Sequence, residues 1–302
     1  MDNYSEQHRA PWYHLRDRIT TIDIGRGITS VGDYAFDGCE ALQTVVMDAD
    51  RSDMAVIGNS AFQDCRQLAV FNIPARTTSI GQAAFRRSGL TAFAVPAYVS
   101  DINVSAFEAC EQLTSVRMSN VQHIRADAFR GCQRLNDVTF SVTLKSIGAN
   151  AFASCTSLTN LQLPTMLTEI GEAAFANNTL LQSLLIPASV ERIGASLVAD
   201  CTNLSQLSCD AACRVTHLSE KCCFNARNLS VLNLPDAMTH IDASALANTM
   251  SLKQLTLPQS LMQIGRQAFE GSGITDLMMP ATMRYLAPRC LYKCQNLRSL
   301  TI

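Results

Sequence analysis

One spacing of apolar residues recurs along almost the whole chain. In LKSIGANAFASCTSLTNLQLP (Leu144–Pro164), Phe152 has an aliphatic residue five positions before it and a cysteine three after it. A leucine six positions after it opens the run L-x-x-L-x-L-P. We call the Phe152 position the anchor; the equivalent anchors are Phe36, Phe62, Phe85, Phe107, Phe129, Phe152, Phe175, Val198, Cys223, Leu246, Phe269 and Leu291. By subtraction of these residue numbers, the anchors are 22 to 26 residues apart, a period typical of a solenoid.

Each repeat predicts one short strand followed by a turn. Apolar residues occupy the first, fourth and sixth positions of the run, as in Leu181, Leu184 and Ile186, and proline usually follows, where it ends a strand. The segment I-G-x-x-A-F then supplies a turn glycine and the spacing of one helical turn. Crossovers between parallel strands are right-handed in nearly all cases. The predicted fold class is therefore an α/β repeat: a right-handed solenoid of about twelve units of 22–26 residues, with one parallel strand per unit and short helical turns on the opposite wall.

The array accounts for nearly all of the length. Because a solenoid grows by stacking and has no fixed core size, we predict a single domain over residues 19–302, with no visible C-terminal cap. Residues 1–18 precede the first strand pattern and include the only tryptophan, Trp12. The first coil must be shielded from water, so we predict that residues 1–18 form an N-terminal cap.

Seven of the twelve cysteines share one slot, three residues after the anchor: Cys39, Cys65, Cys110, Cys132, Cys155, Cys201 and Cys294. In the other repeats this slot holds serine, asparagine, alanine or threonine, so it selects a small side chain. We predict buried free thiols there. Disulfides between stacked neighbours are the alternative, and they would need Cα atoms within about 7 Å of each other.

The densest reactive cluster lies where one repeat is longer than its neighbours. Cys209, Cys213, His217 and Cys222 are a candidate metal site, because thiolate and imidazole groups are the ligands of tetrahedral zinc. The repeat register, however, places Cys209 on the last inward strand position and Cys223 on an anchor. We therefore favour structural thiols; a local Cys209–Cys213 disulfide and metal or redox chemistry remain the alternatives.

Other chemistry is sparse. Asp48, Asp50 and Asp53 form an acidic loop that we interpret as solvated, with weak calcium binding as the alternative. The five histidines are dispersed, and we find no nucleophile elbow, phosphate loop, zinc-protease or dinucleotide motif. The sequence thus predicts no enzyme and no cofactor.

Charge and hydropathy exclude two partner classes. A formal net charge of -2 and a pI near 6.2 give no electrostatic footprint for nucleic acid. No window approaches the apolar run of about 20 residues that a membrane-spanning helix needs, so we expect no membrane insertion. Residues 1–18 contain no apolar core of a secretory signal.

The outward residues of the predicted strands carry few charges and no aromatic ring, which argues against sugar and anion binding. Their neutral polar side chains and small apolar patches suit an extended protein partner. The alternative is that these positions are solvated and bind nothing. The predicted partner-binding residues are Val46, Val70, Asn72, Arg117, Asp137, Thr139, Asn160, Gln162, Leu185, Asn233, Asp276 and Met278.

The unit I-G-x-x-A-F-x-x-C-x-x-L-x-x-Φ-x-Φ-P, present from Ile19 to Ile302, resembles the BspA-like leucine-rich repeats. The opening P-W-Y-x-x-R-x-x-I, Pro11 to Ile19, is similar to the start of such arrays in anaerobic gut and oral bacteria. The resemblance implies a surface or secreted module for adhesion or protein binding. Valine, cysteine or leucine replaces the anchor phenylalanine at four positions, all in the C-terminal part of the chain.

We therefore expect a non-catalytic protein-binding or adhesion module whose partner is a host surface or matrix protein. A structural spacer array, and a thiol-based metal or redox protein using the Cys209–Cys223 cluster, are the alternatives. The expected location is the cell surface or the secreted fraction, with the cytoplasm as the alternative. Because Leu297, Leu300 and Ile302 continue the inward pattern with no cap after them, we expect either a longer array of which this chain is a part or a weak homodimer through the C-terminal repeat.

Overall fold

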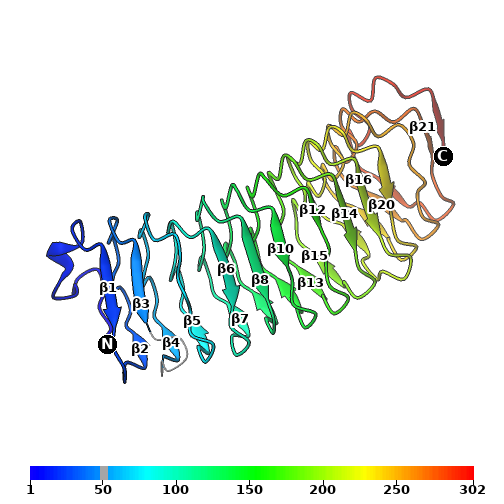
Figure 1. Cartoon of the computed structure of the whole chain (residues 1–302). Helices are drawn as coiled ribbons and strands as arrows, with labels where there is room; N and C mark the ends of the chain where they lie inside the picture. Colours follow the sequence, from blue (N-terminus) through cyan, green and yellow to red (C-terminus); the bar gives the residue numbers. More distant parts are fainter. Residues whose placement is uncertain (48–53) are drawn as a thin grey trace. The chain divides into compact units, whose positions relative to one another are not determined.

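The chain folds into a parallel-strand solenoid, which confirms the predicted fold class. The computed structural model describes residues 1–47 and 54–302; the acidic loop with Asp48, Asp50 and Asp53 lies outside them. Two compact units, Met1–Leu144 and Lys145–Ile302, make up the molecule and are described separately. In each unit, the chain winds through successive coils that contribute short strands to two walls (Figure 1).

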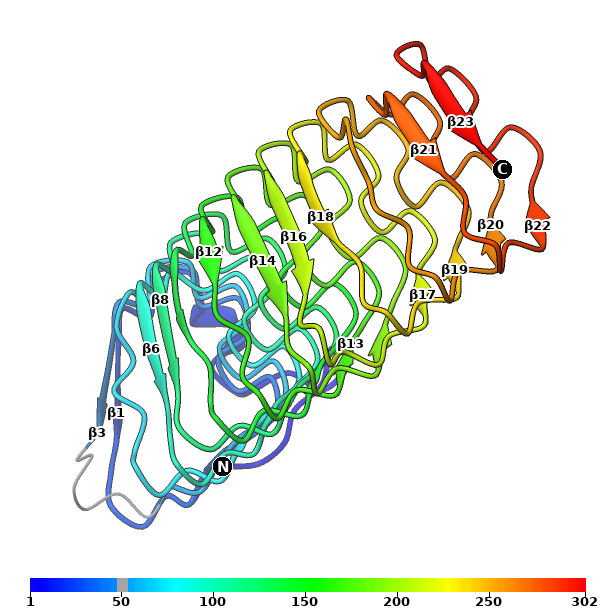
Figure 2. The same cartoon turned by 90° about the vertical axis from the view of Figure 1, so that its right-hand side faces the viewer.

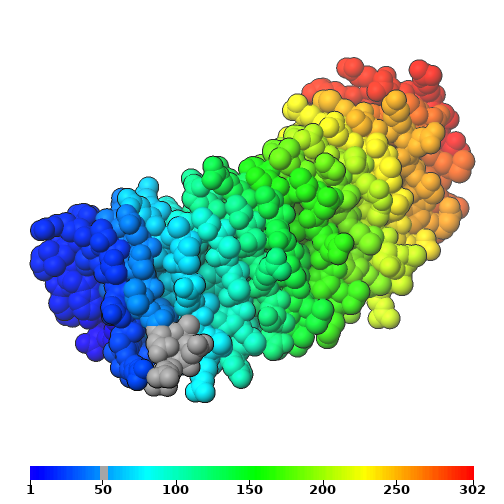
Figure 3. Space-filling view, in the orientation of Figure 1, coloured from blue at the N-terminus to red at the C-terminus, as the bar shows by residue number. Residues whose placement is uncertain are grey.

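In the first unit, strands of up to four residues form one wall and two-residue strands form the other. The first wall contains β1 (Thr21–Ile24), β3 (Thr44–Met47), β6 (Ala92–Val95), β8 (Ser115–Met118) and β10 (Asp137–Thr139). The second wall contains β2 (Ser30–Val31), β4 (Val56–Ile57), β5 (Ser79–Ile80), β7 (Asp101–Ile102) and β9 (His123–Ile124). The pairs β1–β3, β6–β8, β8–β10, β2–β4, β4–β5 and β7–β9 are all parallel. Figure 3 shows successive coils of this unit, from blue to cyan, packed directly against one another.

The second unit repeats this arrangement (Figure 2). Its first wall contains β12 (Asn160–Leu161), β14 (Ser183–Ile186), β16 (Gln206–Cys209), β18 (Val231–Asn233), β21 (Asp276–Met278) and β23 (Ser299–Thr301). Its second wall contains β11 (Ser146–Ile147), β13 (Glu169–Ile170), β15 (Arg192–Ile193), β17 (His217–Leu218), β19 (His240–Ile241), β20 (Gln263–Ile264) and β22 (Tyr285–Leu286). We call the solvent side of the first wall, in either unit, the strand face.

Strand register follows the repeat. Phe93 of β6 pairs with Val116 of β8, so each residue lies beside its equivalent one repeat later. Alternation along the strand buries Phe93 and Val95 and exposes Ala92 and Ala94. Since one face of the wall packs on the core and the other meets solvent, a shift by one residue would expose the whole apolar set.

The anchors form the centre of the core. Phe62, Phe85, Phe107 and Phe129 are fully buried, and their rings stack in the first unit with centroids 5.3 to 5.6 Å apart. In the second unit, Phe152 and Phe175 stack at 6.0 Å. The replacements Val198, Cys223 and Leu246 are also fully buried, and Leu291 is partly exposed.

The wall that was expected to contain short helical turns contains non-helical turns instead. Every repeat has a positive φ two residues before and two residues after its anchor, from Tyr34 (53°) and Gly38 (72°) to Arg289 (61°) and Lys293 (58°). A right-handed helix cannot continue through left-handed residues. Among the described residues, the one helical segment is the 3₁₀ turn η1 (Tyr13–Leu15).

Hydrogen bonds between repeats satisfy the backbone of these turns. The amides of Ser60, Phe62 and Asp64 donate to carbonyl groups of the next repeat, each at 2.8 Å. The alternation of left- and right-handed residues thus points successive amides along the stacking direction, where the neighbouring coil supplies acceptors.

The glycine of I-G-x-x-A-F allows close approach between coils. A Cβ on Gly171 would lie 2.5 Å from the backbone nitrogen of Ala149, too close for any side chain. Its φ is not positive, so glycine is needed here because the neighbouring backbone excludes larger residues and not because of a left-handed conformation.

Residues 1–18 contact the first coil. The indole N–H of Trp12 donates to the carbonyl of Ala35 at 2.7 Å, and its ring stacks on Phe36 at 5.6 Å. The amide of Tyr4 donates to the carbonyl of Asp33 at 2.9 Å. These groups supply donors that a preceding coil would otherwise provide, which supports the proposed role of residues 1–18 as a cap.

Candidate functional site: the strand face

All twelve residues predicted to bind a partner lie on the strand face with exposed side chains. They do not form one cluster, because successive repeats space them along the wall. In the first unit, the largest exposed apolar side chains of this set are Val70 (60 % exposed) and Val46 (47 %). Arg117 and Asp137 lie on neighbouring strands, and their side chains form an ion pair at 3.8 Å.

In the second unit, neutral side chains on the strand face bond to one another. Ser183 donates to the amide oxygen of Asn160 at 3.3 Å, and Asn233 donates to the hydroxyl of Ser208 at 3.0 Å. Ser208 lies in the same outward column but is buried, because Gln206 also bonds to it at 3.1 Å. Leu185, 57 % exposed, lies between these polar groups.

The parallel ladder of the first wall is interrupted within each unit, which the sequence pattern did not predict. In the first unit, residues 68–73 form no strand, and the amide of Ile73 donates to the carbonyl of Phe71 at 3.0 Å, closing a three-residue turn. In the second unit, residues 252–257 keep only a single bridge, between Gln254 and Asp276.

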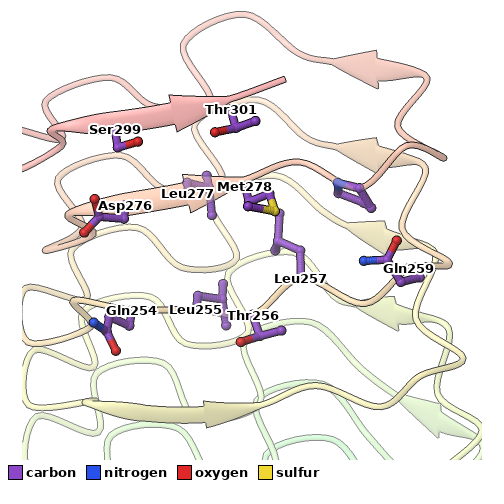
Figure 4. A pocket seen from close by; sticks show the side chains of 11 residues that line it. Gln254, Leu255, Thr256, Leu257, Gln259, Asp276, Leu277, Met278, Ser299 and Thr301 are labelled. Atoms are coloured by element: carbon purple, nitrogen blue, oxygen red, sulfur yellow. The ribbon is translucent and has the colours of Figure 1, made fainter.

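The interruption in the second unit opens a hollow of about 440 Å³ on the strand face. Figure 4 shows Gln254, Leu255 and Thr256 on the irregular segment beside β21, which carries Asp276 and Met278. The full lining is Gln254, Leu255, Thr256, Leu257, Gln259, Asp276, Leu277, Met278, Pro280, Ser299 and Thr301. The lining therefore combines leucine and methionine side chains with neutral hydrogen-bonding groups and one carboxylate.

A second hollow, of about 600 Å³, lies over the interruption in the first unit. Its lining includes Val70, Asn72 and Arg117 of the predicted set, and the exposed Ala92 and Ala94 of β6. Five predicted residues thus line these two hollows: these three in the first unit, and Asp276 and Met278 in the second. Asn233 lines a further hollow of about 340 Å³ in the second unit, and the other predicted residues line none of these three hollows.

The candidate metal site is not assembled. Cys222 is buried, whereas His217 is exposed; its ring Nδ1–H donates to the Asp242 carboxylate at 3.3 Å, and the ring stacks on His240 at 4.2 Å. Within residues 1–47 and 54–302, no group of three or more histidine, cysteine or acidic side chains is arranged to hold a metal ion.

The slot cysteines have a structural reason for their position. The thiols of Cys65, Cys110, Cys132 and Cys201 each donate to the backbone carbonyl of the preceding anchor, at 2.9 to 3.3 Å. In one repeat, Asn178 makes the equivalent bond to Phe152 at 3.0 Å. The slot therefore requires a small side chain and favours a hydrogen-bond donor, although Ala226 fills it without one. All twelve cysteines are free thiols.

Each coil adds a parallel strand to one wall, with its outward side chains on the strand face and its inward apolar side chains in the core. This arrangement is that of a leucine-rich-repeat solenoid. A family model described as "BspA type Leucine rich repeat region (6 copies)" matches residues 13–136, 100–222 and 216–302. The chain belongs to this family.

Solved structures agree with this assignment at the level of the fold. A leucine-rich repeat protein from Bacteroides ovatus has a TM-score of 0.77 and 23% identity, covering 94% of this chain and 79% of its own. A leucine rich cell surface protein from Faecalibacterium prausnitzii has a TM-score of 0.54 and 20% identity, covering 93% and 78%. The T. pallidum leucine rich repeat protein has a TM-score of 0.52 and 27% identity, covering 54% and 78%. A search of curated proteins gave no match.

These findings support a protein-interaction or structural role for the chain. Proteins of this family are typically found at the cell surface or secreted. In the described parts of the chain, no helix has the length and apolar character needed to cross a bilayer.

Proposed function

We propose that the strand face is a non-catalytic protein-binding surface that holds an extended segment of a partner protein, with apolar partner side chains entering the two hollows. The observation that carries this proposal is the exposure of Met278, 70 % exposed at the rim of the 440 Å³ hollow. Large exposed apolar side chains beside a concave site are a common feature of binding surfaces.

The polar groups around the hollow favour an extended protein segment over a small apolar molecule. Gln254, Thr256 and Ser299 can form hydrogen bonds with the backbone of a bound segment, while Leu257 and Met278 can pack against its apolar side chains. Alternating polar and apolar contacts fit an extended chain, whose successive side chains point in opposite directions. The absence of aromatic side chains in the lining argues against a sugar ligand.

The family and the neighbouring structures favour a particular setting for this binding. One similar structure is that of a leucine rich cell surface protein from Faecalibacterium prausnitzii, which supports a surface or secreted location and, with it, adhesion to a host surface or matrix protein. A cytoplasmic protein with the same binding face remains the alternative, as does an array that only spaces other domains.

Selection of linear peptides from a random displayed library tests the proposal. Peptides enriched on the parent protein should lose at least about tenfold in affinity, or about 1.4 kcal/mol, for Met278→Glu and, when they occupy the first unit, for Val70→Glu. Fluorescence anisotropy measures each affinity. Met250→Glu is the matched control, because Met250 is 55 % exposed but lies outside the strand face.

Two outcomes would contradict the proposal. Peptides that bind all variants equally would place the binding surface elsewhere. A failure to enrich any peptide, followed by the same failure with a displayed library of folded domains, would favour the spacer role.

A further inference from the structure

The turn after β16 brings two cysteines together in a place where other repeats hold an aliphatic pair. Cys209, the last residue of β16, lies beside Ile186 in the ladder. Cys213 closes the following turn, since its amide donates to the carbonyl of Asp210 at 2.9 Å. In the preceding repeat, the equivalent turn ends at the buried Val190, whose amide donates to Pro187 at 3.1 Å. The Ile186–Val190 pair of one coil is therefore a Cys209–Cys213 pair in the next.

The thiols of Cys209 and Cys213 interact with each other, and the Cys213 thiol donates to the carbonyl of Val190 in the preceding coil at 3.6 Å. The turn is held from both sides: Ala212 N–H donates to the Asp210 carboxylate at 3.0 Å, and Asp210 N–H donates to Ile186 at 2.9 Å. Two interacting thiols at the ends of one closed turn need little backbone movement to become bonded.

The pair also differs from the buried slot thiols in accessibility. Cys209 is partly exposed, although Cys213 is 2 % exposed. Interaction with Cys209 lowers the pKa of Cys213, whereas interaction with Cys213, together with burial, raises the pKa of Cys209. By contrast, burial raises the pKa of Cys110 and of Cys201 to about 12, and both slot thiols are fully buried. A thiolate is the reactive form of cysteine, so this pair should be oxidised before the slot thiols.

We propose that Cys209 and Cys213 are an oxidative modification site that forms a reversible intramolecular disulfide on reaction with a hydroperoxide. The thiolate of Cys213 attacks the terminal peroxide oxygen; the O–O bond breaks, and the leaving oxygen departs as hydroxide or alkoxide and takes up a proton. The product is a sulfenic acid on Cys213. The sulfur of Cys209 then attacks this sulfenic sulfur, which forms the S–S bond and releases water.

The electrons balance in this sequence. Two thiols lose two electrons and two protons, and one hydroperoxide is reduced to water and an alcohol, or to two waters for hydrogen peroxide. A hydroperoxide is favoured over a bulky disulfide oxidant because Cys213 is nearly buried, and only a small neutral molecule can reach it past Cys209. A dithiol reductant would restore both thiols by exchange.

Two other thiols lie near the pair and define the competing outcome. Cys222 and Cys223 share a hydrogen bond, but both are buried, and contact with Cys222 and burial raise the pKa of Cys223. The thiols of Cys222 and Cys223 should therefore remain reduced when the Cys209–Cys213 pair is oxidised.

The test treats the fully reduced protein with one equivalent of hydrogen peroxide, followed by alkylation of the remaining thiols in denaturant. Intact-mass spectrometry should show the loss of two alkylation sites, and peptide mapping should place the bond between Cys209 and Cys213. Reduction by a dithiol should restore all twelve sites. Cys155→Ser is the control, because it removes a buried slot thiol and should leave the reaction unchanged.

The variants separate the two steps. Cys209→Ser should accumulate a sulfenic acid at Cys213 that a dimedone probe traps, and Cys213→Ser should form neither product at the parent rate. If either variant fails to fold, the mapping of the parent protein alone decides the proposal. A bond at Cys222 or Cys223, a bond between molecules, or twelve alkylated cysteines after peroxide treatment would overturn it.

Discussion

The anchor phenylalanines concentrate the stabilising contacts of a coil in one side chain. Phe107 is fully buried, and its ring stacks between Phe85 at 5.5 Å and Phe129 at 5.3 Å. We predict that Phe107→Ala lowers the free energy of unfolding by about 3–5 kcal/mol, because it removes buried area and leaves a cavity. Urea denaturation measures the change. Phe107→Leu is the control and should cost less; an unchanged stability of Phe107→Ala would show that the anchor does not support the core.

Because of the buried slot thiols, we predict that the free energy of unfolding falls at alkaline pH. Burial raises the pKa of Cys110 and of Cys201 from an ordinary 9.0 to about 12. Below pH 9 both the folded and unfolded states keep these protons, so the stability is fully present. As pH rises above 9 the unfolded state loses protons first, and stability should fall by up to about 1.4 kcal/mol per pH unit for each such thiol.

Urea unfolding between about pH 8 and about pH 10 measures this slope. The double variant Cys110→Ser/Cys201→Ser keeps a small hydrogen-bond donor at both slots and removes both titrating groups, so its stability should fall less steeply. Equal slopes for the parent and the double variant would contradict the buried, protonated state of these thiols.

At the scale of single residues, sequence pattern predicted burial better than it predicted bonding. The shared slot indicated small buried thiols, and six of its seven cysteines are buried. The acceptor of the Cys132 thiol, the carbonyl of Phe107, could not be predicted, because it depends on which way the backbone of the preceding turn points its oxygen. The same limit hid the Cys209–Cys213 contact, which the register alone placed only as two neighbouring core positions.

At the scale of elements, the turns around the anchors contain residues in unfavourable backbone conformations. Ala109 has a φ of 55°, and a left-handed alanine costs about 1–2 kcal/mol, whereas glycine adopts this region freely. We predict that Ala109→Gly raises the free energy of unfolding by up to about 1 kcal/mol, after the entropic cost of glycine. The variant retains the hydrogen bond from the backbone N–H of residue 109 to the carbonyl of Arg130, which is 2.7 Å long.

Ala106→Gly is the matched control in the same repeat. Ala106 is fully buried and has no left-handed φ, so the substitution should lower stability by about 1 kcal/mol. Thermal and urea unfolding of both variants distinguish the two effects. A loss of stability in Ala109→Gly would show that the alanine methyl group, and not its backbone conformation, decides the energy at this position.

Element positions were predictable because the apolar spacing repeats, but element type and continuity were not. The pattern I-G-x-x-A-F has helical spacing, yet two left-handed residues per repeat are satisfied by bonds to the next coil, which a single repeat does not reveal. Residues 252–257 carry the same strand pattern as their neighbours and still keep only one bridge. Residues 68–73 contain Phe71, whose ring packs on Phe62 at 4.9 Å, but Phe93 packs similarly and β6 remains paired.

At the scale of the whole molecule, the repeat period was sufficient to predict the fold but not the position of the candidate site. A period of 22 to 26 residues with inward leucines admits little besides a stacked solenoid. The hollows on the strand face arise where the ladder is interrupted, so they depend on departures from the pattern. Val70, Arg117, Asp276 and Met278 were predicted because alternation makes them outward, and the sequence could not show that they line hollows.

The C-terminal repeat supports a prediction about association between molecules. Ile302 is 84 % exposed and Leu300 is 41 % exposed, and β23 pairs with β21. Exposed apolar side chains on an accessible strand favour pairing with another chain, so we expect a weak, concentration-dependent homodimer through this repeat. Light scattering over a concentration series should show the mass rising for the parent. Leu300→Glu/Ile302→Glu should remain monomeric, because burying two carboxylates at the contact is costly. Val142→Glu, at a side chain that is 74 % exposed in the first unit, should associate like the parent. A strictly monomeric parent, or a dimer that persists in the double variant, would place the association elsewhere or exclude it.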